Sequence, residues 1–130
     1  MTAGWWVQRV LWIDGLAALS AGIFVLALRG ALARLYVLPI ELVTIIAVVN
    51  LSYSAFSLTL AARTRSARPL ALVVSLAAAN CFWACVCTFL VMRCWNVASL
   101  LGLAHIAFEG VFVLALATIE WRNRHLLGVS

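Results

Sequence analysis

Charge is scarce in this sequence, and lysine is absent altogether. Of its 130 residues, 10% are charged and 67% are hydrophobic, whereas a soluble domain is about one-half apolar and one-quarter charged. A soluble domain of this length has too little interior to bury so much apolar surface, so the composition excludes that class. The arginines are confined to the ends of the apolar segments, and we therefore expect no nucleic-acid partner.

The sequence also lacks a CxxC motif, which excludes the usual thiol–disulfide oxidoreductase signature. Cys81, Cys85, Cys87 and Cys94 all belong to one apolar segment or its end, where thiols usually behave as small hydrophobic groups. No second ligand cluster accompanies them, and His105 is the single histidine inside an apolar segment. We therefore expect no metal site, no haem and no other cofactor.

Four apolar segments account for most of the chain, at about residues 11–28, 39–61, 69–92 and 97–121. Each approaches or exceeds the roughly 20 residues that a helix needs to span about 30 Å of hydrocarbon. The connections are short, so neighbouring helices must pack antiparallel. The sequence therefore predicts an all-α fold, in which residues 1–130 form one integral membrane domain, a four-transmembrane-helix antiparallel bundle surrounded by the lipid bilayer.

The arginine distribution predicts how this bundle is oriented. Six arginines lie on the side of the two termini and the second connection, and three lie on the other side. Positive residues favour the cytoplasmic side, so we expect both termini to be cytoplasmic in a multi-pass protein of the inner (plasma) membrane. Ala31-Leu32-Ala33 resembles a signal-peptide cleavage site, but Asp14 interrupts the run before it, and we expect the first helix to be retained.

Glu109 is the most informative single residue, because it lies in the middle of the apolar run LLGLAHIAFEGVFVLALA. His105 precedes it by one helical turn, so the two side chains share a helix face. Ionisable groups inside the hydrocarbon region are costly and usually face a bundle interior or a cavity. We therefore interpret Glu109 and His105 as a candidate catalytic acid/base pair.

Other polar residues are predicted to lie at a similar depth. Asn50 and Asn80 are each eleven residues into their segments, about 16 Å deep, and Glu109 is about 18 Å deep. Tyr53 shares a helix face with Asn50, and Trp83 shares one with Asn80. These residues are candidate substrate-binding groups of a pocket near the bilayer centre. A purely structural role, in which they hydrogen-bond between helices, stays open.

The remaining acids are predicted to have different roles. Asp14 lies near the cytoplasmic end of the first segment, where we expect it to reach interfacial water or to cap the inner mouth of the pocket. Glu41 follows Pro39 in an arrangement typical of a helix start, so we expect a mainly structural role, with substrate binding as the alternative. Glu120 precedes Arg122 near the membrane surface, and we expect it to form an interfacial ion pair.

Two short motifs resemble those of a known family. The run from His105 to Gly110, H-x3-E-G followed by aromatic and aliphatic residues, resembles a stretch of the emopamil-binding protein family, which includes the sterol double-bond isomerase. Asn80-x2-Trp83 is similar to the N-x2-W motif of that family, although the two motifs occur here in reversed order. The resemblance implies proton transfer to and from a sterol, with His105 and Glu109 as the acid/base pair and Asn80 and Trp83 as pocket partners.

Three classes of function are compatible with these observations. We favour acid/base isomerisation or cyclisation of a lipophilic small molecule, such as a terpenoid or a sterol-like compound, in a dry pocket. A non-catalytic lipid-binding or assembly subunit of a membrane complex is the first alternative. A small proton-coupled transporter, which would work as a homo-oligomer, is the second.

Overall fold

The computed structural model describes residues 3–129, which are helical apart from short connections and one isolated β-bridge. The long helices are α1 (Ala3–Ala27), α3 (Ile40–Ala62), α4 (Leu70–Cys94) and α5 (Leu100–Arg122). The short elements are α2 (Arg29–Tyr36), the 3-10 turn η1 (Arg65–Ala67) and α6 (Arg124–Leu127). Each long helix is long and apolar enough to cross a membrane. The predicted all-α fold with four membrane-spanning segments is therefore confirmed for the described residues.

The helix bounds depart most from the prediction at α1, which begins at Ala3 rather than near residue 11. Hydropathy marks the apolar part of a helix, whereas the backbone hydrogen bonds continue through polar residues such as Gln8 and Arg9. At α5 the predicted start is three residues early. Here the Ser99 side chain accepts a hydrogen bond of 3.2 Å from the backbone of Gly102, which caps the helix and fixes its first turn.

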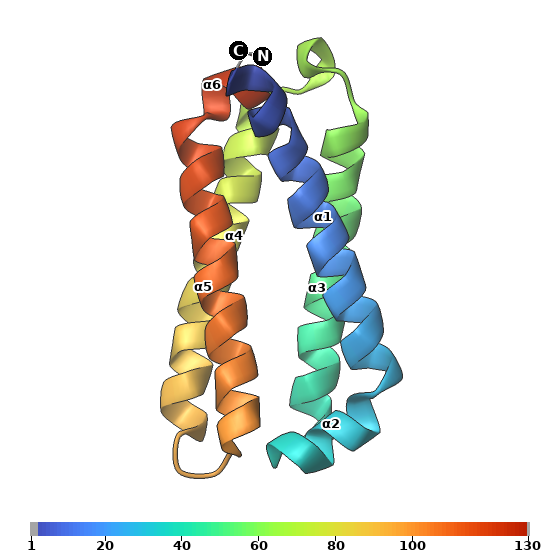
Figure 1. Cartoon of the computed structure of the whole chain (residues 1–130), viewed down its shortest axis with the longest axis vertical. Helices are drawn as coiled ribbons and strands as arrows, with labels where there is room; N and C mark the ends of the chain where they lie inside the picture. Colours follow the sequence, from blue (N-terminus) through green and yellow to red (C-terminus); the bar gives the residue numbers. More distant parts are fainter. Residues whose placement is uncertain (1–2, 130) are drawn as a thin grey trace.

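The four long helices form two antiparallel pairs (Figure 1). Helix α1 packs along α3, and α4 packs along α5, whereas the two pairs contact each other at few positions. The pairs are joined mainly at their ends, where α2 meets α3 and α5 at one end and α6 meets α1 and α4 at the other. The fold therefore consists of two tight helical hairpins held together at both ends.

Glycine allows the close approach of α1 to α3. A Cβ atom on Gly15 would lie 2.7 Å from side-chain atoms of Leu58, and one on Gly22 would lie 2.7 Å from Leu51. Small residues at helix contacts let the backbones approach, which is how membrane helices gain packing energy without a hydrophobic driving force. These two glycines, seven residues apart on one face of α1, therefore define the contact within this pair.

Arg68 connects the elements at the end of the bundle that carries α6. Its buried guanidinium donates to the backbone oxygens of Leu60 at 2.8 Å, Ala61 at 3.1 Å and Leu127 at 3.4 Å, and also to the side chain of Gln8. The last carbonyls of a helix have no intrahelical partner, so Arg68 satisfies those at the end of α3 while it holds α1 and α6.

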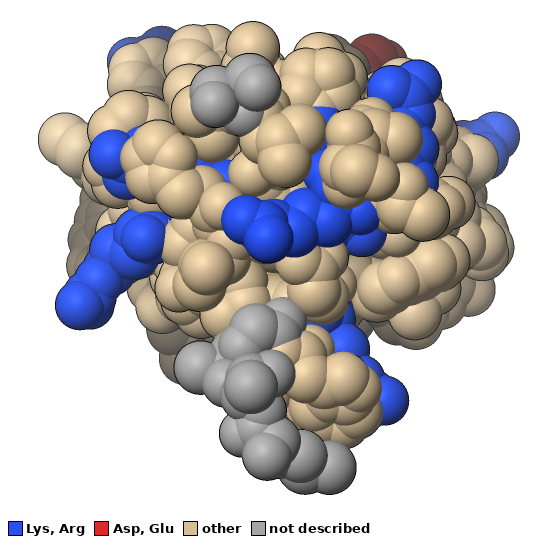
Figure 2. All heavy atoms as spheres, turned by 90° about the horizontal axis from the view of Figure 1, so that it is seen from above, with Lys and Arg blue, Asp and Glu red and all other residues tan. Residues whose placement is uncertain are grey.

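Both ends of the chain lie at the same end of the bundle (Figure 1). Arginine side chains gather on that surface, as the end-on view shows (Figure 2). This arrangement agrees with the predicted antiparallel order of four spans. The assignment of this end to the cytoplasm stays a prediction from the arginine distribution.

Helix α2 was not predicted, because residues 29–36 were expected to be part of a simple connection. Leu32, Ala33 and Tyr36 are buried on one face of this helix. Val37 ends it with a left-handed backbone (φ 55°), and the backbone N–H groups after Tyr36 bond back to the carbonyls of Arg34 and Ala33. The short helix therefore packs its buried face against α3 and α5, and Tyr36 is buried at this end of the bundle.

Candidate functional site

A cavity of about 710 Å³ lies between the two helix pairs. All four long helices contribute to its walls, which are mostly alanine, valine and aromatic side chains. Of the eight site residues predicted from sequence, all except Glu41 line this cavity. A volume of this size is typical of small-molecule sites, which range over roughly 300–1,000 Å³.

Glu109 joins three helices within the cavity wall. Its Oε1 accepts a hydrogen bond of 2.6 Å from Trp83 Nε1 on α4 and one of 2.8 Å from Asn50 Nδ2 on α3. Both nitrogens are donors only, so this oxygen acts as an acceptor of two hydrogen bonds. The geometry is that of a carboxylate held in a fixed orientation by neutral partners.

His105 faces the other oxygen of the same carboxyl group. Its Nε2 lies 3.6 Å from Glu109 Oε2. This distance is within the range of an ion pair but is too long for a hydrogen bond. On the opposite side of the ring, Nδ1 is 2.8 Å from the hydroxyl of Tyr36. Burial raises the pKa of Tyr36 above its ordinary value, so this hydroxyl keeps its proton at neutral pH. A neutral imidazole that accepts from Tyr36 at Nδ1 carries its own proton on Nε2, toward Glu109.

We call Tyr36, Asn50, Trp83, His105 and Glu109 the Glu109 cluster. It contains the predicted acid/base pair together with two of the predicted binding residues. Tyr36 is the member that was not predicted from the sequence. The available signal was the spacing of Leu32 and Tyr36, which places an apolar residue and a tyrosine on one face of a short helix.

A second polar cluster lies toward the other end of the cavity. Asp14 Oδ2 accepts hydrogen bonds of 2.6 Å from the hydroxyl of Tyr53 and 3.0 Å from that of Ser57. Asn80 Nδ2 donates a hydrogen bond of 3.1 Å to Glu120 Oε2. Asn80 lines the cavity together with Asp14, and the carboxyl groups of Asp14 and Glu120 are close enough to affect each other's ionisation. We call these five residues the Asp14 cluster.

The expected roles of Glu120 and Asn80 were wrong in their details. Glu120 was expected to pair with Arg122 at the membrane surface, but it is 0% exposed and bonds to Asn80, while Arg122 is exposed. Successive helical residues point about 100° apart, so a neighbour in sequence is not a neighbour in space. Asn80 was expected beside Glu109, but its amide bonds to Glu120, roughly 16 Å further along α5.

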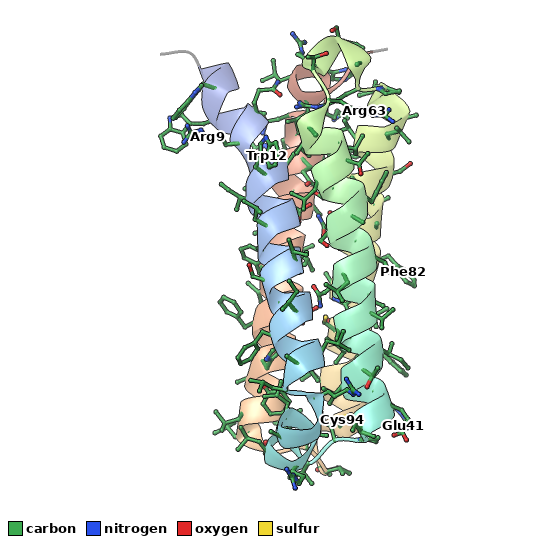
Figure 3. All side chains as sticks on the ribbon, turned by 90° about the vertical axis from the view of Figure 1, so that its right-hand side faces the viewer. Arg9, Trp12, Glu41, Arg63, Phe82 and Cys94 are labelled. Carbon is green, nitrogen blue, oxygen red and sulfur yellow. The ribbon has the colours of Figure 1, made fainter. Side chains whose placement is uncertain are left out.

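Asp14 lies deeper than the interfacial position that was expected, whereas Glu41 lies at a helix start as expected. Asp14 is 1% exposed, so it does not reach interfacial water; it lines the cavity from inside the bundle. Glu41 is exposed in the first turn of α3, at the end of the bundle opposite to Arg9 (Figure 3). Its position agrees with the structural role at a helix start and separates it from the cavity.

The cavity wall combines acids with aromatic rings, and His105 is its one basic side chain among the described residues. None of the arginines in residues 3–129 lines the cavity. Phe82 and Phe108 line it and are at the same time 69% and 71% exposed on the outside of the bundle. Phe82 projects from the side of the bundle, between its two ends (Figure 3). The cavity therefore borders the lateral surface, which in a membrane is in contact with lipid chains.

The four long apolar helices are compatible with a small multi-pass membrane protein, and polar side chains line a cavity between them. Comparisons of the chain with protein-family models, with curated proteins and with solved structures found no match. The residues of the cavity are therefore the observations that bear on function.

Proposed function

We propose that the protein binds a lipophilic small molecule in its cavity and catalyses proton transfer to and from it, as in the isomerisation of a carbon–carbon double bond. The observation that supports this most directly is the His105–Glu109 pair on the wall of an apolar cavity of about 710 Å³. The resemblance of the H-x3-E-G and N-x2-W motifs to those of the sterol isomerase family supports the same reaction class.

The proposed reaction leaves the composition of the substrate unchanged. For the reaction, the His105–Glu109 pair must first hold one additional, acidic proton. One carbon of the double bond accepts this proton, and positive charge develops on the neighbouring carbon. A proton then leaves the next carbon for the pair, and its C–H electrons form the new double bond. The face of the Trp83 ring and the carboxylate of Glu109 stabilise the passing cation in this water-poor site.

The remaining members of the Glu109 cluster are positioning residues in this proposal. Asn50 and Trp83 hold Oε1, so Oε2 keeps its direction toward the imidazole. Tyr36 holds the ring of His105 from the other side. Fixed partners of this kind reduce the reorganisation that a proton transfer requires.

Deuterium incorporation tests this proposal with a mixture of lipids in place of a single chosen substrate. The purified protein is reconstituted in lipid nanodiscs in D2O, incubated with neutral lipids extracted from its native membrane, and the lipids are analysed by mass spectrometry. We expect one lipid class to gain deuterium and to change its double-bond position at an otherwise unchanged formula. Glu109→Gln should remove the incorporation while the protein keeps its elution volume and thermal transition.

Glu41→Gln is the matched control, because it makes the same change of a carboxyl to an amide outside the cavity. This variant should incorporate deuterium like the unaltered protein. Full incorporation by Glu109→Gln would rule out the assigned acid/base role. Binding of a lipid without any exchange would favour the non-catalytic lipid-binding alternative.

A further inference from the structure

Asp14 and Glu120 form a buried pair of acids that the proposed reaction does not use. Asp14 belongs to α1 and Glu120 to α5, so each comes from a different helix pair, and their exposures are 1% and 0%. Asn80, which donates to Glu120, lines the same cavity as Asp14, and the two carboxyl groups are close enough to affect each other's ionisation. Two negative charges this close, away from water, repel strongly.

No cation neutralises this pair within the described chain. The donors to the two carboxyl groups are Tyr53, Ser57 and Asn80, all of them neutral. Tyr53 is a further titratable group that faces the pair, and its hydroxyl donates to Asp14. Arg68 lies toward the same end, but its nitrogens are bonded to backbone oxygens and to Gln8.

One oxygen of the pair has no hydrogen-bond donor. Glu120 Oε2 accepts from Asn80, whereas Oε1 is fully buried and has no partner among the described residues. A buried polar atom without a partner is rare and requires an explanation. A proton shared between Asp14 and Glu120 supplies the missing donor and removes one of the two negative charges, as in other pairs of adjacent carboxyl groups.

The pair also has access to a ligand, because Asp14 lines the cavity. The cavity wall carries no arginine, and aromatic rings surround it, including Tyr53 and Phe112. Apolar walls, ring faces and an acid are the groups that recognise an organic cation. Glu109 is the other acid in the wall, but its Oε1 already accepts hydrogen bonds from Asn50 and Trp83, and its Oε2 faces the imidazole of His105 at 3.6 Å. Among the described residues, the hydrogen-bond donors to Asp14 are the neutral hydroxyls of Tyr53 and Ser57, so this acid in the wall attracts a bound positive charge.

We propose that the Asp14–Glu120 pair holds one proton and releases it to water when a lipophilic cation binds in the cavity beside Asp14. The net charge of the occupied site then stays the same: one positive charge enters and one proton leaves. A bare metal ion fits less well, because the cavity of about 710 Å³ is far larger than an ion and its wall is mainly apolar. This inference does not depend on the proton-transfer reaction at Glu109.

Titration calorimetry with tetraphenylphosphonium, a lipophilic cation that carries no titratable proton, tests the coupling. The protein in nanodiscs is titrated at one pH in two buffers with different heats of protonation, with empty nanodiscs as the reference for partitioning into lipid. The difference in heat gives the number of protons released. We expect about one proton per bound cation for the unaltered protein.

Two variants separate the roles of the two acids. Asp14→Asn should weaken binding by about tenfold or more, because it removes a charged contact to the cation. Glu120→Gln leaves Asp14 as the only acid of the pair and replaces one carboxyl oxygen of residue 120 with an NH2 donor. This variant should therefore still bind the cation but release no proton. The protonated carboxyl group of the unaltered protein should give an infrared carbonyl band that is absent in Glu120→Gln.

Glu109→Gln is the control that distinguishes this inference from the proposed reaction. This variant should bind the cation and release the proton like the unaltered protein. The inference is overturned if the unaltered protein does not bind tetraphenylphosphonium, if binding releases no proton, or if Glu109→Gln alone removes the release. If adding sodium chloride releases the proton and adding tetraphenylphosphonium does not, the site binds a metal ion, and the assignment to an organic cation is wrong.

Discussion

Asn50 on α3 donates a hydrogen bond of 2.8 Å to Glu109 on α5, and this bond crosses from one helix pair to the other. It joins long helices of different pairs through their side chains. The same bond orients the carboxyl group at the centre of the candidate site. Asn50 therefore contributes both to helix association and to site geometry.

Asn50→Leu should both loosen the two pairs and disorient Glu109. Interhelical hydrogen bonds in membrane proteins contribute about 0.6 kcal/mol on average and up to about 1.7 kcal/mol. We expect a loss of stability of about 1–2 kcal/mol, measured by unfolding in mild detergent. Thr59→Val is the control, because the exposed Thr59 hydroxyl bonds only to Ala55 of its own helix at 2.6 Å. Equal effects of the two changes would contradict the special role of Asn50.

Tyr36→Phe should reduce proton transfer while the fold is retained. It removes the 2.8 Å contact to His105 Nδ1 and leaves the buried ring in place. We expect deuterium incorporation to fall about tenfold, the effect of losing roughly one hydrogen bond that positions a catalytic group. Tyr53→Phe makes the same change in the Asp14 cluster and should leave this rate nearly unaltered. A similar loss in both variants would indicate a general packing effect.

The reaction should not be limited by ionisation of Tyr36 at alkaline pH. Burial raises the pKa of this hydroxyl, so its protonated form persists above the ordinary value for tyrosine, about 10. The contribution of Tyr36 is therefore present below that pH and is lost only as the pH rises beyond it. A pH profile of deuterium incorporation should show the same alkaline limb for the unaltered protein and for Tyr36→Phe below about pH 10.

Arg68→Met should be among the most destabilising changes near the membrane surface. It removes the Arg68 donor from the backbone oxygen of Ala61 and one of the two donors to that of Leu60, and it breaks the link from the end of α3 to Gln8. We expect a loss of about 3 kcal/mol, seen as a lower midpoint of thermal unfolding. Arg63→Met removes an exposed arginine from the same end of the bundle (Figure 3) and should change the midpoint little. A small effect of Arg68→Met would mean that water replaces its bonds.

Gly22→Val should separate α1 from α3. The new side chain would begin 2.7 Å from Leu51 and 3.1 Å from its backbone nitrogen, so the helices must move apart. We expect a loss of about 1–3 kcal/mol, as for other cases of overpacking. Gly30→Ala is the control, because a Cβ there meets nothing within 4 Å and alanine favours the helix. Unfolding in detergent should show opposite signs for the two changes.

The sequence was sufficient to predict the spans and the Glu109 site. Long apolar runs predict membrane helices because the bilayer requires internally bonded backbone. Asn50 and Glu109 were expected at one depth because a helix has a fixed rise per residue, and their side chains do meet. The same depth estimate placed Asn80 at the level of Glu109, although the Asn80 amide bonds to Glu120. Depth was predictable, but the rotation and tilt of each helix depend on packing between elements.

Two further features required the structure. The role of Tyr36 depends on α2, a short amphipathic helix whose formation is favoured by burial against α3 and α5 rather than by its length. The predicted ion pair of Glu120 followed from its proximity to Arg122 in the sequence. In the structure the Glu120 side chain is buried inside the bundle, whereas Arg122 is exposed. Hydropathy alone gives no signal for either contact.

The exposed rings of Phe82 and Phe108 place the edge of the cavity at the lateral surface, so the proposed ligand would enter from the lipid phase. A ligand that arrives between lipid chains is presented at its mole fraction in the membrane rather than at its concentration in water. Occupancy should therefore follow the ratio of ligand to lipid and should fall when inert lipid or detergent is added at constant total ligand. Affinities for this protein are meaningful when they are expressed per lipid molecule.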